Sequence, residues 1–302
     1  MLRLGLCCIF RHEPIKFRTT TAMALSNMSR RKAVNKISEL CIHNALSLNE
    51  ALAYCNNHGI GAFRISSGIL PMRTHPHLGY TIDELPGATQ VRTLLSKCNK
   101  FALNNSIRTT FHPDQFVVLN SPRPEVVESS IAELEHHGEM AELLGADVIN
   151  IHAGGAYGDK EKALDRLVAG IHRLTIRVRK RLTLENDDKS YTPVDILPFC
   201  WREKIPFVYD VHHHRCLPDG ASIEDVTMAA LQTWNREPLF HISSPLNGWN
   251  GKFLERHHDF IDIKDFPKAW RKLKITVEVE AKAKEIAVEK LRIDLNSQRF
   301  KN

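Results

Sequence analysis

Long apolar runs and paired cysteine motifs are both missing from this sequence. Its 302 residues contain no stretch of about 18 consecutive apolar residues, the length that a membrane-spanning helix needs. The amino-terminal apolar stretch is interrupted by Arg3 and has no small-residue cleavage site, so a secretory signal is not expected. The seven cysteines include no CxxC pair, and Cys7 and Cys8 are adjacent, which does not suit a disulfide framework. We therefore expect a reduced, soluble, cytoplasmic protein that does not associate with membranes.

A strong charge bias and low-complexity segments are also missing. Charged residues make up 25% of the chain and hydrophobic residues 43%, a balance that excludes wholesale disorder. Lys and Arg number 41 against 35 Asp and Glu, so the protein is mildly basic, which permits an anionic partner without requiring one. No flexible linker or internal repeat divides the chain. Residues 1–302 are therefore predicted to form a single domain.

Short apolar runs, typical of buried parallel strands, alternate with segments of helical spacing. One such helix is predicted between Pro124, which suits a first turn, and Gly145, which suits a helix end. Residues 9–31 are expected to be a long loop, and 282–295 a final helix. A doubly wound open sheet would be favoured by a glycine-rich turn after the first strand, and none is present. The pattern predicts a (β/α)8 TIM barrel. The expected strands are residues 3–8, 61–65, 107–111, 148–152, 182–185, 207–210, 240–243 and 275–280.

Imidazole and carboxylate side chains stand at the ends of six successive predicted strands. In a TIM barrel these ends converge on one face, where active sites are built. Such side chains suit zinc, manganese or iron, and carboxylates can bridge two or three ions. Any one of the histidines could instead be a hydrogen-bonded core residue or simply exposed, but the repetition favours a metal site with Glu185 as the bridging carboxylate. His213 is preferred over its neighbours His212 and His214. The candidate ligands are His112, His152, Glu185, Asp210, His213, His241 and Glu280.

Cations are also concentrated after the predicted strands. They would surround the metal-binding face and could contact phosphates. The basic run at residues 177–181 precedes the fifth strand, so it is expected at the opposite end of the barrel. The distribution favours a polyanionic substrate. The cations that follow strand ends are Arg11, Lys16, Arg18, Arg73, Arg123, Lys160, Lys162, Lys189, Arg215 and Lys252.

Nine sequence stretches resemble the ultraviolet-damage endonuclease family, whose members are metal-dependent barrel enzymes that nick DNA beside photolesions. They occur in family order over nearly the whole chain: RLGL, FRISSGILPMRTHP, FHPDQFVVLNSP, INIHAGGAYGDKEKAL, LTLENDD, PFVYDVHHH, HISSP, HHDFID and VEVEAKAKE. The pattern is more distantly similar to the AP endonuclease barrels with a three-metal site. The resemblance implies a TIM barrel of the AP-endonuclease and xylose-isomerase type. It also implies hydrolysis of damaged double-stranded DNA on the 5′ side of the lesion, with no obligate protein partner.

The resemblance also implies roles for individual residues. It implies up to three divalent ions, with Mn²⁺ favoured over Zn²⁺, Mg²⁺ or Co²⁺, and it adds His258 to the seven ligands named above. His75 falls where the family keeps a pocket histidine near the scissile phosphate, so His75 and Glu185 are the expected catalytic residues. The alternative for His75 is a loop histidine packed on Pro76. The expected DNA contacts are Gln115, Phe116, Leu6, Tyr157 and Arg73.

Two departures from the family pattern bear on substrate recognition and on the metal site. Leu6 stands where the family usually has a tyrosine that pairs with the wedge glutamine. Leu239 stands where the family often has a modified lysine beside the metals, and leucine cannot be a ligand. We therefore expect phosphodiester hydrolysis to be retained while the lesion-reading surface is altered. Two alternatives remain: a metal-dependent sugar isomerase or epimerase on the same barrel, and a catalytically silent protein that binds distorted DNA.

Overall fold

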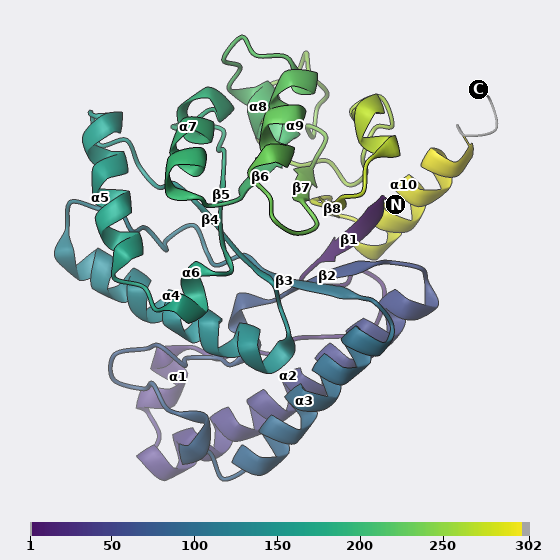
Figure 1. The fold of residues 1–302 in the computed structure, drawn as a ribbon. Helices are drawn as coiled ribbons and strands as arrows, with labels where there is room; N and C mark the ends of the chain where they lie inside the picture. The colour runs from purple at the N-terminus through teal and green to yellow at the C-terminus, as the bar shows by residue number, and fades with distance from the viewer. Residues whose placement is uncertain (1, 298–302) are drawn as a thin grey trace.

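The computed structural model describes residues 2–297, in which eight strands form a closed parallel barrel surrounded by helices (Figure 1). Each strand pairs with the next along the chain, and β8 closes the barrel by pairing with β1, where Gly5 lies opposite Glu278. All eight predicted strands are confirmed, with boundaries that differ by at most one residue at either end. The strands are β1 (Arg3–Cys7), β2 (Ala62–Ile65), β3 (Arg108–Phe111), β4 (Val148–His152), β5 (Leu182–Glu185), β6 (Phe207–Asp210), β7 (Leu239–Ile242) and β8 (Thr276–Val279).

Helices cover the outside of the barrel, and the long helices α2 and α3 lie side by side beneath it in the view of Figure 1. Short 3-10 turns lie at Ser67–Ile69 (η1), Ile82–Glu84 (η2) and Lys268–Lys272 (η3). The α-helices are α1 (Ala22–Ser26), α2 (Arg30–Asn57), α3 (Ala88–Asn104), α4 (Pro124–Leu144), α5 (Lys160–His172), α6 (Ile176–Arg179), α7 (Pro193–Glu203), α8 (Val211–Cys216), α9 (Ile223–Gln232) and α10 (Glu285–Ser297).

The ends of α4 are those that its sequence predicts. Pro124 occupies the first helical turn, where a missing backbone N–H costs nothing. Gly145 follows the last turn with φ 72°, a left-handed conformation that glycine adopts without steric cost. A Cβ atom at Gly145 would also lie 2.5 Å from Asn99 Oδ1. Glycine is therefore required at this position on both counts.

The predicted loop at residues 9–31 is partly wrong, because it contains α1 and the first residues of α2. Thr21 caps α1 by accepting a hydrogen bond from Ala24 N at 3.2 Å, a signal too short to stand out in the sequence. The start of the segment is anchored by the buried Glu285 of α10, whose carboxylate accepts hydrogen bonds from the backbone of Arg11 (2.8 Å) and His12 (2.7 Å). The loop that follows β1 is thus fixed to the last helix.

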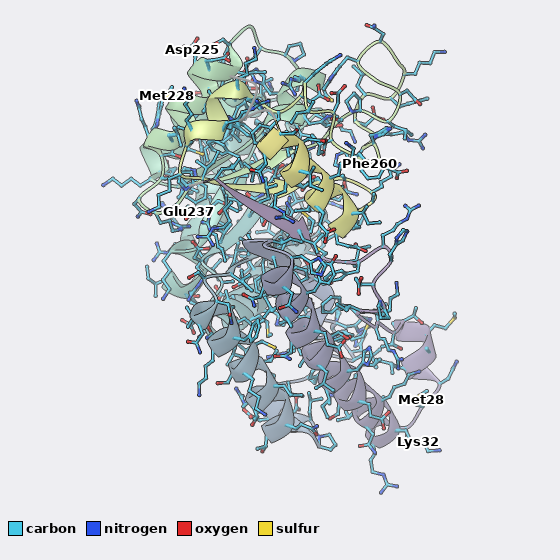
Figure 2. The ribbon with its side chains drawn as sticks, turned by 90° about the vertical axis from the view of Figure 1, so that its right-hand side faces the viewer. Met28, Lys32, Asp225, Met228, Glu237 and Phe260 are labelled. Carbon is cyan, nitrogen blue, oxygen red and sulfur yellow. The ribbon has the colours of Figure 1, made fainter. Side chains whose placement is uncertain are left out.

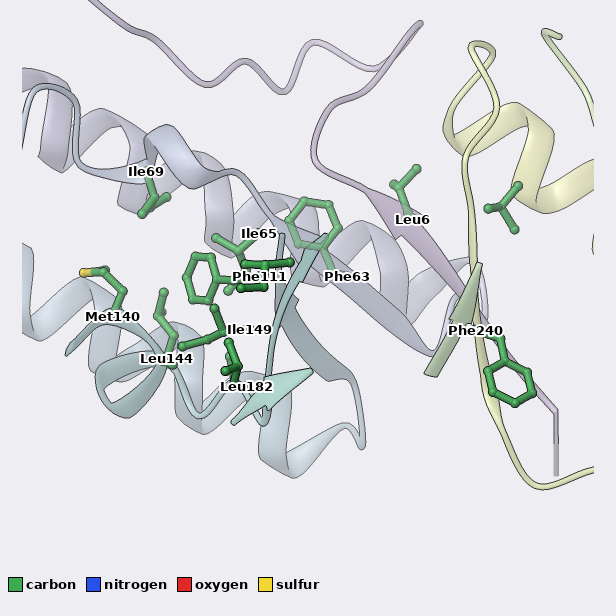
Figure 3. Packing of buried hydrophobic residues seen from close by; sticks show 14 of the residues in the cluster. Leu6, Phe63, Ile65, Ile69, Phe111, Met140, Leu144, Ile149, Leu182 and Phe240 are labelled. Carbon is green, nitrogen blue, oxygen red and sulfur yellow. The ribbon is translucent and has the colours of Figure 1, made fainter. Parts of the chain in front are cut away.

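The two sides of each strand have different chemistry. Successive residues of a strand point to opposite sides, so Leu6, Phe63 and Phe240 pack into the hydrophobic layer between the strands and the helices (Figure 3). Inside the barrel, Arg64 and Thr110 both donate hydrogen bonds to Glu278. The main hydrophobic core therefore lies outside the strands, while the barrel interior combines these charged and polar side chains with a small apolar cluster of Val148, Val208 and Leu239.

The loops that follow the strands lie on one side of the molecule. Figure 2 shows Phe260, which follows β7, on the opposite side from Glu237, which precedes that strand. Glu237 forms an ion pair with Arg3 at 2.9 Å at the amino-terminal end of the barrel. The cysteines are all free, and no helix of the described residues is both long and apolar enough to cross a bilayer.

Candidate metal centre

Glu185 lies at the centre of a cluster of imidazoles at the carboxyl ends of the strands. Its Oε2 atom is 3.1 Å from His112 Nε2, and its Oε1 atom is 3.1 Å from His241 Nδ1 and 3.4 Å from His213 Nδ1. The carboxylate is fully buried and also accepts a hydrogen bond from the Asn150 side-chain amide. Although burial opposes ionisation, the imidazolium of His241 holds the pKa of Glu185 well below its ordinary value. Glu185 is therefore a charged carboxylate whose two oxygens could each ligate an ion.

Three groups of side chains in this cluster have the spacing of metal ligands. They are His112 with His152 and Glu185, His112 with His241 and Glu280, and Glu185 with Asp210 and His213. Within each group the ligand atoms lie within 4.8 Å of one another. Because Glu185 and His112 each belong to two groups, the three groups form one continuous centre. The structure thus brings together the seven residues that the strand ends predicted.

Buried polar atoms without partners show that this centre fits a cation. His152 Nδ1 and Asp210 Oδ2 are buried and have no hydrogen-bond partner among the described residues. Leaving such atoms unsatisfied is costly, so buried polar atoms in native proteins nearly always have a partner. Burial also lowers the pKa of His152, which keeps the imidazole neutral, the form that ligates metals. Both observations agree with a divalent ion as the missing partner.

The adjacent histidines after β7 are not equivalent, because only one of them contacts the ligand cluster. His257 Nδ1 lies 4.0 Å from Glu280 Oε2, at the edge of the ligand cluster. The ring of His258 is engaged in its own turn, where Nδ1 accepts a hydrogen bond from Phe260 N at 3.0 Å. The geometry therefore favours His257 over the expected ligand His258, whose role stays a prediction. Two neighbouring histidines have the same local sequence, so only the path of the backbone decides which ring faces the centre.

A buried carboxylate behind His241 orients its ring. His241 Nε2 lies 3.2 Å from Glu278 Oε2 and 2.9 Å from Arg64 Nη2. Metal ligation through Nδ1 leaves the ring proton on Nε2, and of these two neighbours only the carboxylate can accept it. Against the effect of burial, Arg64 and His241 hold the pKa of Glu278 at about 2. Sequence reasoning missed both Arg64 and Glu278, although each is a charged residue within an otherwise apolar strand.

The comparisons with known proteins agree with this geometry. Residues 2–301 match the family model described as UV-endonuclease UvdE. The chain belongs to this family. A UV DNA damage endonuclease of Bacillus cereus (strain 03BB102) is 33% identical over 293 residues, which cover 93% of this chain and 90% of that protein. The crystal structure of SacUVDE has a TM-score of 0.87 at 30% identity and covers 99% of both chains. The predicted family and the predicted TIM barrel are both confirmed.

A more distant structure shows the fold alone. Endonuclease IV from Thermus thermophilus has a TM-score of 0.62 at 12% identity and covers 99% of this chain. The UvdE-family protein thus shares its barrel architecture with that enzyme, as the sequence predicts.

The predicted pocket histidine of this UvdE-family protein has a defined tautomer. His75 lies between η1 and η2, and its Nδ1 atom accepts hydrogen bonds from the backbone N–H groups of His77 and Leu78, each at 3.2 Å. Its ring proton is therefore on Nε2, which can donate. Among the described residues no hydrogen bond or ion pair joins His75 to the Glu185 cluster. Its catalytic role stays a prediction.

Three of the predicted DNA contacts are exposed on loops that follow strands. Gln115 and Phe116 lie between β3 and α4, and 78% of Phe116 is exposed. The turn is held by Asp114, whose carboxylate accepts a hydrogen bond from Phe116 N at 3.0 Å. Tyr157, between β4 and α5, is 50% exposed and has Arg166 over its ring at 5.5 Å. These side chains are free to contact a bound molecule.

The other two predicted DNA contacts point into the fold. Leu6 has no exposed surface and belongs to the core outside the barrel (Figure 3), so the prediction that it contacts DNA is wrong for this structure. Arg73 is only partly exposed, because it pairs with Glu139 at 3.0 Å and lies over the ring of Tyr80. A phosphate would have to compete with that ion pair, so the geometry does not favour Arg73 as a DNA contact. Leu239 is fully buried beside Val148 and Val208, as expected of a side chain that cannot ligate.

Proposed function

We propose that this UvdE-family protein is a metal-dependent DNA repair endonuclease. It would hydrolyse the phosphodiester bond on the 5′ side of ultraviolet photolesions or other distorting damage. The observation that carries the proposal is the contact of one buried carboxylate, Glu185, with three imidazoles at the mouth of the barrel. The substrate would be damaged double-stranded DNA.

The ligand groups would hold up to three divalent ions, for which we propose Mn²⁺, with Zn²⁺, Mg²⁺ or Co²⁺ as alternatives. Ions bound there would supply hydroxide near neutral pH and stabilise the negative charge that develops on the phosphate. Glu185 would bridge two positions, and Glu278 would keep the Nδ1 lone pair of His241 directed at the centre. The Nε2–H group of His75 would donate a hydrogen bond to a non-bridging phosphate oxygen.

The exposed loop residues would select damaged DNA. Gln115 and Phe116 project from the turn after β3, where an amide and an aromatic ring can enter a base step. Tyr157 adds a second ring on the next loop. Damaged base pairs cost less to unstack than intact ones, so insertion of these side chains favours a distorted duplex.

Cleavage of defined duplexes tests the proposal. A 5′-labelled duplex with one cyclobutane dimer should be cut immediately 5′ of the dimer with Mn²⁺ and remain intact with a chelator, and an undamaged duplex should survive both. His241→Ala should abolish the cut while leaving DNA binding largely unchanged. Cutting only at an abasic site would retain the chemistry but change the lesion. Unchanged nicking by the His241 variant would remove the metal centre as the site of hydrolysis.

The sugar-isomerase alternative rests on the barrel alone. Substrates of such enzymes are small, whereas this rim exposes aromatic side chains from separate loops, including Phe116 and Tyr157. The family match, which covers residues 2–301, also favours the nuclease. If the protein holds its metals but cuts no duplex, isomerase or epimerase activity on sugar phosphates should be assayed next.

A further inference from the structure

Residues 245–257, which follow β7, form a closed loop with its own hydrogen bonds. Its two ends meet in an antiparallel bridge between Pro245 and His257, and Leu246 N donates to Arg256 O at 2.6 Å. Trp249 anchors the outer part, because its indole Nε1–H donates to Asp265 Oδ1 at 2.8 Å. A loop with paired ends and a hydrogen-bonded, half-buried anchor holds its exposed side chains in defined positions.

The base of this loop lies at the metal centre. His257 is the residue beside Glu280, and Glu255 and His257 line a cavity of about 420 Å³ together with Arg64 and Glu280. The same cavity is bordered by Ile9 of the loop after β1. The base of the 245–257 loop therefore lies at the barrel mouth, beside the proposed metal ligand Glu280.

Phe253 is presented to solvent at the outer part of the loop. It is 60% exposed, and its φ of 59° is a left-handed conformation that bulky residues rarely adopt. Arg256 lies over its ring at 5.4 Å, and the preceding Lys252 is exposed. An aromatic ring beside two cations suits a base and its flanking phosphates.

The short chain between Phe253 and His257 limits how far this ring is from the metal centre. Four residue steps span at most about 14 Å, even when fully extended. Successive nucleotides of a strand rise about 3.4 Å along the duplex, so this reach corresponds to about four nucleotides. The Cα atom of Phe253 is therefore within about four nucleotide steps of the Cα atom of His257, which is close enough for a duplex bound at the centre to extend to this loop.

Tyr157 has the same combination of features on another loop. Its φ is 50°, it is half exposed, and Arg166 lies over its ring. With Phe116, these residues place three exposed aromatic rings on loops that follow β3, β4 and β7. The strand β1 contributes none, because its sequence RLGLC contains no aromatic residue and Leu6 is buried.

We propose that Phe253 stacks on a base beside the lesion and is, with Phe116, one of the residues that hold the distorted duplex. This inference rests on the proposed endonuclease function. In this arrangement the 245–257 loop supplies an aromatic contact that the buried Leu6 cannot make, while Lys252 and Arg256 bind the adjacent phosphates.

The test compares two exposed aromatic residues at opposite ends of the barrel. Phe253→Ala is set against Trp201→Ala, because Trp201 is 48% exposed near the end of α7 and precedes β6. Both variants are loaded with Mn²⁺, and their metal content is measured first to show that the His257 end of the loop is intact. Binding of DNA is then measured on samples in which Ca²⁺ replaces Mn²⁺, so that the duplex is not cut. The duplex contains one dimer and carries 2-aminopurine within four nucleotides of the lesion.

Phe253→Ala should bind the damaged duplex about tenfold more weakly and lose part of the 2-aminopurine fluorescence rise that unstacking produces. Trp201→Ala should behave as the wild type, and Phe253→Trp should restore both signals. Equal affinity and equal fluorescence for Phe253→Ala and Trp201→Ala would overturn the inference. Failure of the wild type itself to bind damaged DNA would overturn the proposed function and this inference with it.

Discussion

The outer and inner faces of the barrel strands differ in what their side chains contribute. On the outer face, Phe63 and Phe240 are fully buried apolar residues that pack beneath the helices. On the inner face, Arg64, Glu278 and His241 are equally buried but charged or polar. Burial of apolar surface stabilises the fold, whereas burial of ionisable groups is costly unless each finds a partner. The outer face therefore stabilises the fold, and this stabilisation offsets the cost of burying the ionisable side chains of the inner face.

The largest effect on function should come from the inner face. Glu185→Gln removes the charge shared by three imidazoles while keeping the size of the side chain. We expect nicking of a dimer-containing duplex to fall at least about 1000-fold, because metal-assisted stabilisation of the phosphate charge contributes several kcal/mol. Nicking rates measured with saturating Mn²⁺ test this. Thermal unfolding of the metal-free protein should show a smaller loss of stability than Phe63→Ala, because glutamine keeps the packing, and an equal or larger loss would contradict the division between the two faces.

The largest effect on stability should come from the outer face. Phe63→Ala removes a fully buried ring that lies in the hydrophobic cluster beside Leu6 (Figure 3). The expected loss is about 3–5 kcal/mol of unfolding free energy, from lost burial and the cavity that remains. Urea unfolding followed by circular dichroism measures it. The folded fraction should still bind its metals, and loss of metal binding by folded protein would contradict a division of roles between the two faces.

A smaller effect, on metal affinity, is expected from Glu278, which contacts the candidate ligand His241 without belonging to the ligand groups. Glu278→Gln keeps the shape of the side chain but removes the charge that receives the Nε2 proton of His241. Substituting a carboxylate that hydrogen-bonds to a metal-ligating histidine lowers the metal affinity about 10–100-fold. Competitive titration with a fluorescent chelator measures the affinity. The matched control is Glu237→Gln at the amino-terminal end of the barrel, where Glu237 pairs with Arg3 and touches none of the ligands. Equal metal affinity in both variants would leave Glu278 a purely structural residue.

The neighbouring histidines His257 and His258 offer a test of side-chain direction. His257→Ala should reduce the number of bound ions by about one, whereas His258→Ala should leave metal content unchanged and only loosen the turn at Phe260. Metal analysis of the purified variants by mass spectrometry distinguishes them. The reverse result would restore His258 as the ligand.

The smallest effect concerns the pH dependence of stability in metal-free protein. The pKa of Glu278 is about 2 in the folded chain against an ordinary value of 4.5. A carboxylate with a lowered pKa stabilises the fold above its unfolded pKa, and this contribution is lost as the pH falls from about 4.5 towards 2. The unfolding temperature of the wild type should therefore fall more steeply over this interval than that of Glu278→Gln. Parallel curves would show that Arg64 and His241 do not favour the ionised form.

Much of the fold and of the candidate metal centre could be predicted from the sequence. The strands were recognisable because buried parallel strands are short apolar runs, and their ends carried the ligands of the centre. The direction of a side chain was harder to predict. Leu6 occupies the position of the family's tyrosine, yet its side chain points outward into the core. Arg73 follows a strand, yet it pairs with Glu139. Phe253 had no local signal, since a single exposed aromatic residue in a loop is common in any protein.

The sequence by itself determined the barrel, the family and the positions of seven candidate ligands, because these depend on patterns that are local to each strand and on motifs in a fixed order. The tertiary structure alone decided which of two adjacent histidines lies beside Glu280, that Glu278 contacts His241, and that Phe253 is exposed on a loop whose base lies at the centre. Those features depend on contacts between segments far apart in the chain. The direction of each side chain there is set by the packing of the whole barrel, which no local pattern records.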